Sequence, residues 1–194
     1  MNDHRPTVRY TERWNDLLLQ PIDGYDWIDA DQARALFEND PDRGVMVVGG
    51  TEHEPTGEFA PRWVLGFSAG ARVQFLDEQG SLVRLIDYDL IDGRLWRWVT
   101  VDYVHPNNTQ RWSKRDAVQK IETTIRPDGR GYLTTLDKTD ATTSRPPTET
   151  SEIVVPIKDS YWLDWPTFGD WAALTNPGPS AWEIAGQSLP SPTN

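Results

Sequence analysis

After residue 44, hydrophobic and polar positions alternate along much of the chain, in short runs separated by turn residues. Runs in which every second side chain is apolar are typical of half-buried antiparallel strands. We expect strands at 45–48, 62–67, 71–76, 81–91, 94–104, 118–126, 131–137 and 152–157. Hairpin turn sequences separate several of them: Asp77-Glu78-Gln79-Gly80, Asp92-Gly93 and Pro127-Asp128-Gly129. The pattern predicts an antiparallel meander of six to eight strands, curled into a half-barrel or barrel.

The first 44 residues have a different pattern. Asp29 and Gln32 have the spacing of a helix capping box. Apolar residues follow at helical spacing: Ala33, Leu36 and Phe37. We expect a helix that ends near Asn39-Asp40-Pro41, because proline cannot continue it. The preceding residues, around Leu17-Leu18-Leu19, are ambiguous between helix and strand, and we interpret them as helical.

The end of the sequence is rich in tryptophan and is expected to cover one face or end of the sheet. Pro166 suits the first position of a short helix, which Asn176-Pro177-Gly178 would end. Residues 139–150 contain almost no apolar side chains and predict a mobile loop. We therefore expect a single, β-dominated α+β domain over 1–194, with a helical N-terminal part at 1–44, a sheet at 45–157, a covering segment at 158–186 and a disordered tail at 187–194.

The Asp92-Gly93 turn fixes a register for the strands beside it. If it is a two-residue turn, Ile91 faces Arg94 and the remaining pairs follow by counting. Trp96 and Trp98 then lie opposite Asp89 and Asp87, and Asp102 shares their face. The other face carries the apolar residues together with a smaller polar set: Arg84, Tyr88, Arg97 and Tyr103.

The face with the two tryptophans is the first candidate site. Aromatic anchors among charged groups are typical of protein interfaces, so Trp96, Trp98, Asp87, Asp89 and Asp102 could bind a partner protein or a polar ligand. The same residue types are also common on solvent-facing or tail-covered sheets. The pair Asp87 and Asp89 is in addition a weak candidate for the acid and base of a carbohydrate-active enzyme.

The opposite face offers an alternative. If the sheet closed, Arg84, Arg97, Tyr88 and Tyr103 would line a lumen suited to a small anionic ligand. The arginines would then be buried and paired with acids such as Glu122 or Asp137. Otherwise they lie near the edge of the sheet and extend into solvent, which is the interpretation we favour.

Composition excludes several classes of function. With 30 acidic and 19 basic residues the net charge is −11, which disfavours nucleic acid and anionic membranes and favours a basic partner. The absence of cysteine excludes thiolate chemistry and cysteine metal sites. The histidines, His4, His53 and His105, lack ligand spacing, so no metal or other cofactor is expected. Without an apolar run that could span a bilayer, we expect a soluble cytoplasmic protein.

Residues Gly66 to Gly70 match the G-x-S-x-G pattern of the hydrolase nucleophile elbow, but a strand pattern follows where that motif needs a helix. We interpret it as a simple turn. The sequence therefore predicts a non-catalytic binding protein for a basic partner, of an immunity-protein or inhibitor kind. A small-molecule-binding barrel and a carbohydrate-active enzyme are the alternatives, and the sequence does not define the oligomeric state.

Overall fold

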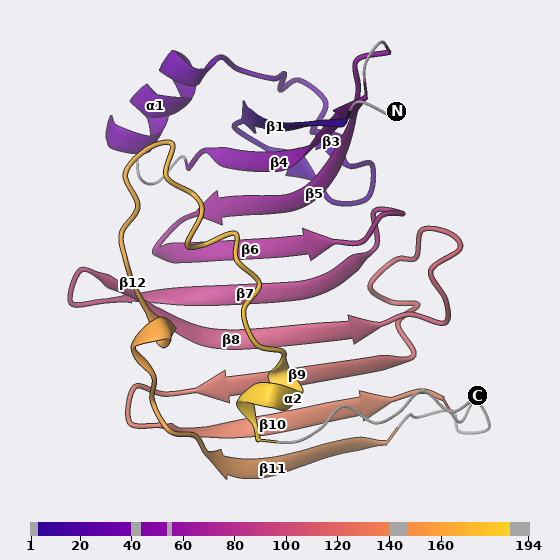
Figure 1. The fold of residues 1–194 in the computed structure, drawn as a ribbon, viewed down its shortest axis with the longest axis vertical. Coiled ribbons are helices and arrows are strands. Elements are labelled where there is room, and N and C mark those ends of the chain that lie inside the picture. Colours follow the sequence, from indigo (N-terminus) through magenta and orange to yellow (C-terminus); the bar gives the residue numbers. More distant parts are fainter. Residues whose placement is uncertain (1–3, 40–43, 54–55, 140–146, 187–194) are drawn as a thin grey trace.

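The computed structural model describes residues 4–39, 44–53, 56–139 and 147–186, and its main feature is one large antiparallel sheet (Figure 1). The main strands, in their order across the sheet, are β1 (His4–Thr11), β4 (Met46–His53), β5 (Glu58–Phe67), β6 (Gly70–Leu76), β7 (Leu82–Ile91), β8 (Arg94–Val104), β9 (Gln119–Ile125), β10 (Arg130–Asp137) and β11 (Thr148–Val154). From β4 to β11 each strand pairs with the next in sequence, so the predicted β-dominated antiparallel meander is confirmed. Within the described residues the sheet is open, with β1 and β11 as its edges.

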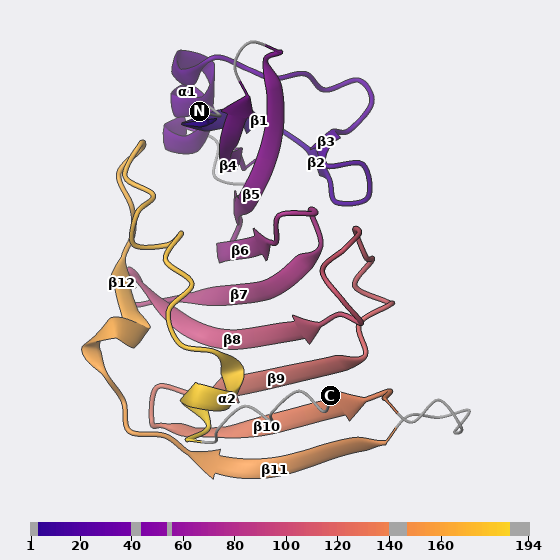
Figure 2. The same cartoon turned by 45° about the vertical axis from the view of Figure 1, so that its right-hand side comes forward.

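The remaining elements lie on the two faces of this sheet. They are β2 (Trp14–Asn15), β3 (Gln20–Pro21), α1 (Ala30–Asn39), the 3₁₀-helix η1 (Asp159–Tyr161), β12 (Trp162–Asp164) and α2 (Ala181–Ile184). Figure 2 shows β12 and α2 on one side of the sheet and the β2–β3 hairpin on the other. β12 pairs with β8 alongside Arg94 to Trp96, where β9 no longer accompanies that strand.

The helix prediction is confirmed, but residues 1–44 are not mainly helical. The Gln32 N–H donates to Asp29 Oδ1 at 2.8 Å and the Asp29 N–H to Gln32 Oε1 at 3.3 Å, which closes the capping box of α1. The residues before it form β1, which pairs along its length with β4, and the β2–β3 hairpin. Around the three leucines, Asn15 Oδ1 accepts from two backbone N–H groups and Leu19 has a positive φ of 53°, so a turn replaces a helix.

The β7–β8 hairpin contains a bulge that the predicted register lacks. Pairing follows the prediction from Ile91 to Tyr88, but Asp87 then pairs with Val99, which leaves Trp98 as an extra residue in β8. A one-residue shift moves every later side chain to the other face. Asp102, predicted beside the tryptophans, therefore lies opposite Arg84, and Tyr103 lies on the face where Asp102 was expected.

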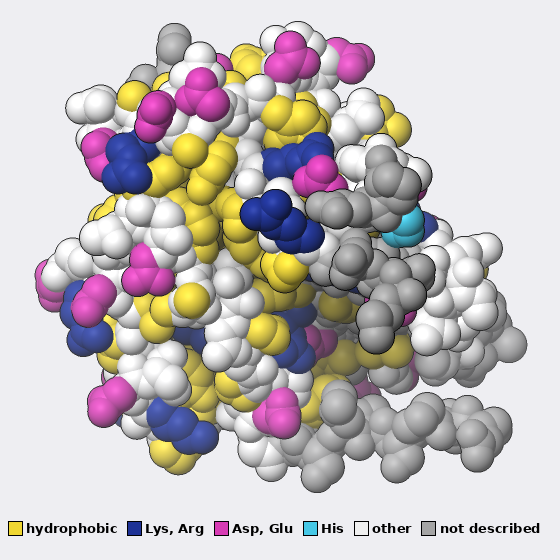
Figure 3. Space-filling model, turned by 45° about the horizontal axis from the view of Figure 1, so that its top comes forward, with side chains coloured by type: hydrophobic (Ala, Val, Ile, Leu, Met, Phe, Trp, Pro, Cys, Tyr) yellow, Lys and Arg dark blue, Asp and Glu magenta, His cyan; other side chains and the backbone are white. Residues whose placement is uncertain are grey.

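We call the side of the sheet that carries α1, β12 and α2 the covered face and the other side the open face. On the covered face, apolar side chains from successive strands form one core: Val47, Leu65, Val73, Ile86 and Leu95. Phe37 of α1 and Trp171 and Leu174 of residues 162–186, hereafter the C-terminal segment, pack onto it. Figure 3 shows the molecule turned so that the top of the Figure 1 view comes forward. Hydrophobic side chains are visible there between scattered acidic and basic ones.

The C-terminal segment covers the sheet as predicted, with different local structure. The residues after Pro166 form turns rather than a helix. The helix comes later, at α2, where Ser180 and Glu183 form a capping box. Of the predicted loop at 139–150, residues 140–146 lie outside the described residues and the last three belong to β11, which begins at Thr148. The predicted tail at 187–194 also lies outside the described residues.

Candidate functional site

Trp98 is a large aromatic residue on the open face, with an exposed fraction of 42%. The bulge places Trp98 with Asp87 and Asp89 in the lining of a groove of about 380 Å³ that reaches the β5–β6 turn. The β2–β3 hairpin covers the neighbouring part of the open face, where Trp14 packs on Val48 and Val64 and Asp16 accepts a hydrogen bond from Gln74 at 3.4 Å.

An ion pair forms one wall of this groove. Arg72 Nε and Nη2 donate to the two carboxylate oxygens of Asp87, at 2.6 and 2.9 Å. This hydrogen bonding raises the pKa of Arg72 above its ordinary value. Asp89 lies beside the pair and is exposed. Farther across the same face, Lys120 pairs with Glu122 at 2.7 Å. The open face is thus a mixed polar surface in which Asp89 keeps an accessible carboxylate.

The structure separates the two tryptophans that the sequence places together. Trp96 is 1% exposed, and its indole N–H donates to the Ile125 carbonyl at 2.8 Å. Its ring contacts Trp162, with ring centroids 4.8 Å apart, and Tyr161. Because β9 pairs only with Val99 to Val104, the ring fills the space where β9 leaves β8. Trp96 therefore anchors the C-terminal segment and is not part of a binding surface.

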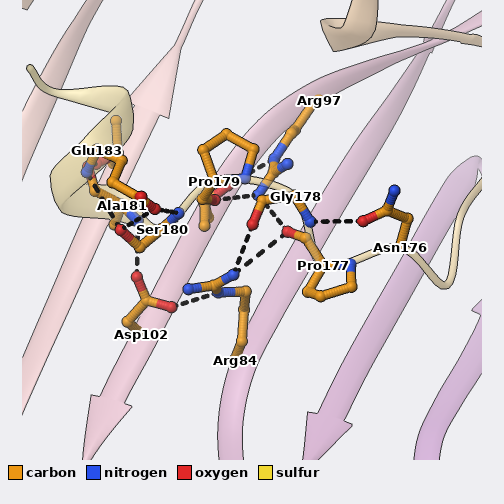
Figure 4. A network of polar contacts seen from close by, with 12 residues as sticks. Arg84, Arg97, Asp102, Asn176, Pro177, Gly178, Pro179, Ser180, Ala181 and Glu183 are labelled. Atoms are coloured by element: carbon orange, nitrogen blue, oxygen red, sulfur yellow. Dashed lines mark hydrogen bonds and ion pairs between the residues drawn. The ribbon is translucent and has the colours of Figure 1, made fainter.

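Arg84, Arg97 and Asp102 form a polar network on the covered face (Figure 4). Arg84 Nε donates to Asp102 Oδ1 at 2.5 Å, and the second carboxylate oxygen accepts from the Ala181 N–H at 2.6 Å. Arg84 also donates to the Gly178 carbonyl at 3.0 Å. Asp102 thus links β7 to the start of α2, which explains why a polar residue faces the covered side.

Arg97 completes this network. It is 5% exposed, and it donates to Thr100 Oγ1 at 3.0 Å and to the carbonyls of Pro177 and Pro179 at 3.1 and 2.9 Å. Burial lowers the pKa of Arg97, but guanidinium stays charged in proteins. Burial also raises the pKa of the neighbouring Tyr88. The edge interpretation is wrong for Arg97, and its partners are the Thr100 hydroxyl and two backbone carbonyls rather than the predicted acids Glu122 and Asp137.

The cap of α2 contains a carboxyl group whose pKa is lowered by its hydrogen bonds. Glu183 accepts from the Ser180 N–H and hydroxyl, each at 2.7 Å, and these bonds lower its pKa below the ordinary 4.5. A carboxyl group with a lowered folded-state pKa stabilises the fold above its unfolded pKa, and this contribution is lost as pH falls through the folded value. We expect Glu183→Gln to show a smaller drop in melting temperature than the parent between about pH 6 and 3, measured by circular dichroism. Equal drops would contradict this role.

The hydrolase-like motif does not form a catalytic site. Residues Gly66 to Gly70 make the β5–β6 turn, in which the Ser68 N–H donates to the Gly70 carbonyl, and a strand follows. Gly70 pairs with Asp89, whereas His105 bonds the Leu82 carbonyl at the other end of β7. Ser68 and His105 are therefore roughly 20 Å apart along the strand. Within the described ranges, no group of three or more histidine and acidic residues is placed to bind a metal.

A second groove, of about 570 Å³, was missed by sequence reasoning. It lies between the β2–β3 hairpin, the β6–β7 turn and residues 111–115, and both Trp14 and Trp112 line it. A signal was present, since three of the five residues from Arg111 to Arg115 are basic in a chain of net charge −11. Its partner elements are distant in sequence, so nothing in the local pattern placed Trp14 beside this cluster.

Compared with models of protein families, with curated protein sequences and with solved structures, the chain has no match. In the part of the chain that the structure describes, no helix has the length and apolar character needed to cross a bilayer. The site alone therefore carries the functional argument.

Proposed function

We propose that the protein is a non-catalytic binding protein whose open face holds a basic partner protein. The observation that carries the proposal is the bulge at Trp98, which presents a half-exposed indole in one groove with carboxylates on the open face. Large aromatic side chains surrounded by polar groups are the usual energetic centres of protein interfaces. A bulge that re-aims one side chain is a common device at binding sites.

The surroundings of Trp98 favour a basic partner. Asp87 and Glu122 already pair with Arg72 and Lys120 across this face. A further acid in the same groove, Asp89, is exposed and takes part in none of the ion pairs of the described residues. The overall charge of −11 would attract a basic protein at long range and accelerate its association.

The two alternatives have less support. The barrel hypothesis needs a closed sheet around a lumen, whereas the described sheet has two edges and Arg84 and Arg97 bind the C-terminal segment. The carbohydrate-active hypothesis needs a carboxyl group that can give up a proton, whereas both oxygens of Asp87 accept from Arg72. We therefore favour binding over catalysis.

The proposal is tested by affinity capture from cells that naturally contain the protein, with purified variants as bait. We expect a basic protein in stoichiometric amounts with the parent chain, and at least about tenfold weaker binding with Trp98→Ala or Asp89→Lys. Tyr25→Ala, which removes an aromatic residue of similar exposure from the loop after β3, outside the groove that Trp98 lines, is the matched control and should bind like the parent. Equal binding by all four proteins, or no captured protein, would contradict the proposal.

A further inference from the structure

The second groove has walls that are fixed before any ligand arrives. Arg111 donates to three carbonyls, those of Gly80 at 3.2 Å, Leu17 at 2.8 Å and Asp16 at 2.7 Å. These bonds join residues 111–115 to the β6–β7 turn and to the β2–β3 hairpin. The Trp112 N–H also donates to Ser81 Oγ at 3.1 Å, and its indole N–H donates to the Asn107 carbonyl at 3.0 Å. Such cross-linking lowers the entropy that a ligand must overcome to bind.

The interior of the groove is largely apolar. Trp14, only 9% exposed, lies on one side with Leu19, while Leu76 and Leu82 of the sheet and Trp112 line the rest. A volume of about 570 Å³ lies within the range of pockets for small organic molecules. An occupant with a flat or aliphatic body would bury apolar surface against these side chains.

The charge at this groove is opposite to that of the whole chain. Three basic residues line it, Arg111, Lys114 and Arg115, against one acid, Asp16. Lys114 and Arg115 are exposed and take part in none of the ion pairs of the described residues. The whole chain has a net charge of −11, but this groove has a local excess of two positive charges. A positive excess beside an apolar pocket favours binding of an anion.

We propose that this groove binds a small amphipathic anion, an organic molecule with an apolar body and one carboxylate, sulfonate or phosphate group. The body lies against Trp14, Leu82 and Trp112, and the anionic group lies at the rim near Lys114 and Arg115. Arg111 has most of its donors engaged by the carbonyls and therefore acts as a positioning residue. This groove is a separate site from the proposed interface. Gln74 lies between the two grooves and lines both, whereas Trp98 lines only the first groove and Trp112 only the second.

The test uses two probes that share one aromatic body, 1-anilinonaphthalene-8-sulfonate and its uncharged analogue N-phenyl-1-naphthylamine. We expect the sulfonate to bind one site per chain, and at least about tenfold more tightly than the uncharged probe. The indole N–H signals of Trp14 and Trp112 should shift during the titration in nitrogen-15 NMR spectra, whereas that of Trp98 should not. Phe substitutions at these positions would assign the three signals.

Charge reversal at the rim tests the anion directly. The double variant Lys114→Glu/Arg115→Glu should bind the sulfonate at least about tenfold more weakly and the uncharged probe as before. Arg126→Glu/Lys158→Glu makes the same change of total charge at distant exposed positions and should bind both probes like the parent. Equal affinity for the two probes, unshifted Trp14 and Trp112 signals, or the same loss in both double variants would overturn the proposal. None of these results depends on the partner protein, so the two proposals can fail separately.

Discussion

Replacing Trp96 with alanine is expected to lower the free energy of unfolding by about 3–5 kcal/mol. The indole is 1% exposed, and its removal leaves a cavity between β8, β9 and the aromatic residues Tyr161 and Trp162. The Ile125 carbonyl also loses its indole donor. Urea unfolding, followed by far-ultraviolet circular dichroism, measures the change.

Trp98→Ala is the matched control for this prediction. It removes the same side chain two positions farther along the same strand, but from the half-exposed ring of the open face. We expect a loss of no more than about 1 kcal/mol, because substitutions at exposed positions rarely cost more. Similar losses of unfolding free energy in the two variants would contradict the assignment of Trp96 to the core and of Trp98 to the surface.

Replacing Arg97 with methionine is expected to cost about 3 kcal/mol of stability. Methionine keeps the apolar stem but removes the donors to Thr100 and to the carbonyls of Pro177 and Pro179, which lie in a desolvated part of the covered face. The C-terminal segment should then detach more readily. We therefore expect faster proteolytic cleavage within residues 165–180, measured by mass spectrometry of timed digests, together with the loss seen in urea unfolding.

Arg72→Met provides the comparison for Arg97. Arg72 is another arginine of the sheet, and it donates two hydrogen bonds to Asp87. Its side chain is 60% exposed, so water screens this ion pair. We expect this variant to lose no more than about 1 kcal/mol and to keep its resistance to proteolysis. If Arg97→Met were as stable as Arg72→Met, the carbonyl contacts would not be what holds the C-terminal segment.

The sheet could be predicted because its signals are local. Alternation and turn sequences identified β6, β7, β8, β9 and β10 with nearly correct ends, and the Asp29 capping box identified the start of α1. β1 was missed because it pairs with β4, some 40 residues away, and its sequence gives only weak alternation. An edge strand of this kind is specified by its partner rather than by its own pattern.

The candidate site was predicted only in part, and the bulge is the reason. The pattern Val99, Val101 and Tyr103 looks like a core-facing set, so the sequence predicts an uninterrupted register along the strand. In the structure Thr100 and Asp102 face the covered side, where Arg97, Arg84 and the Ala181 N–H satisfy them. A buried polar residue is indistinguishable in sequence from an exposed one until its distant partners are known.

The pairing of β12 with β8 also affects how the chain can reach its native state during synthesis on the ribosome. Arg94 bonds Asp164, 70 residues later, and Asp102 accepts from Ala181, 79 residues later. A nascent chain that has emerged only as far as β11 therefore has its meander but lacks the cover for Val73, Ile86 and Leu95, and the charged groups of Arg84 and Arg97 lack their carbonyl partners. Contacts of such long sequence separation form late and leave apolar surface open to aggregation meanwhile. The cover therefore closes only after the sheet has been synthesised, and chaperones that hold exposed apolar strands would act between the emergence of β11 and that of α2.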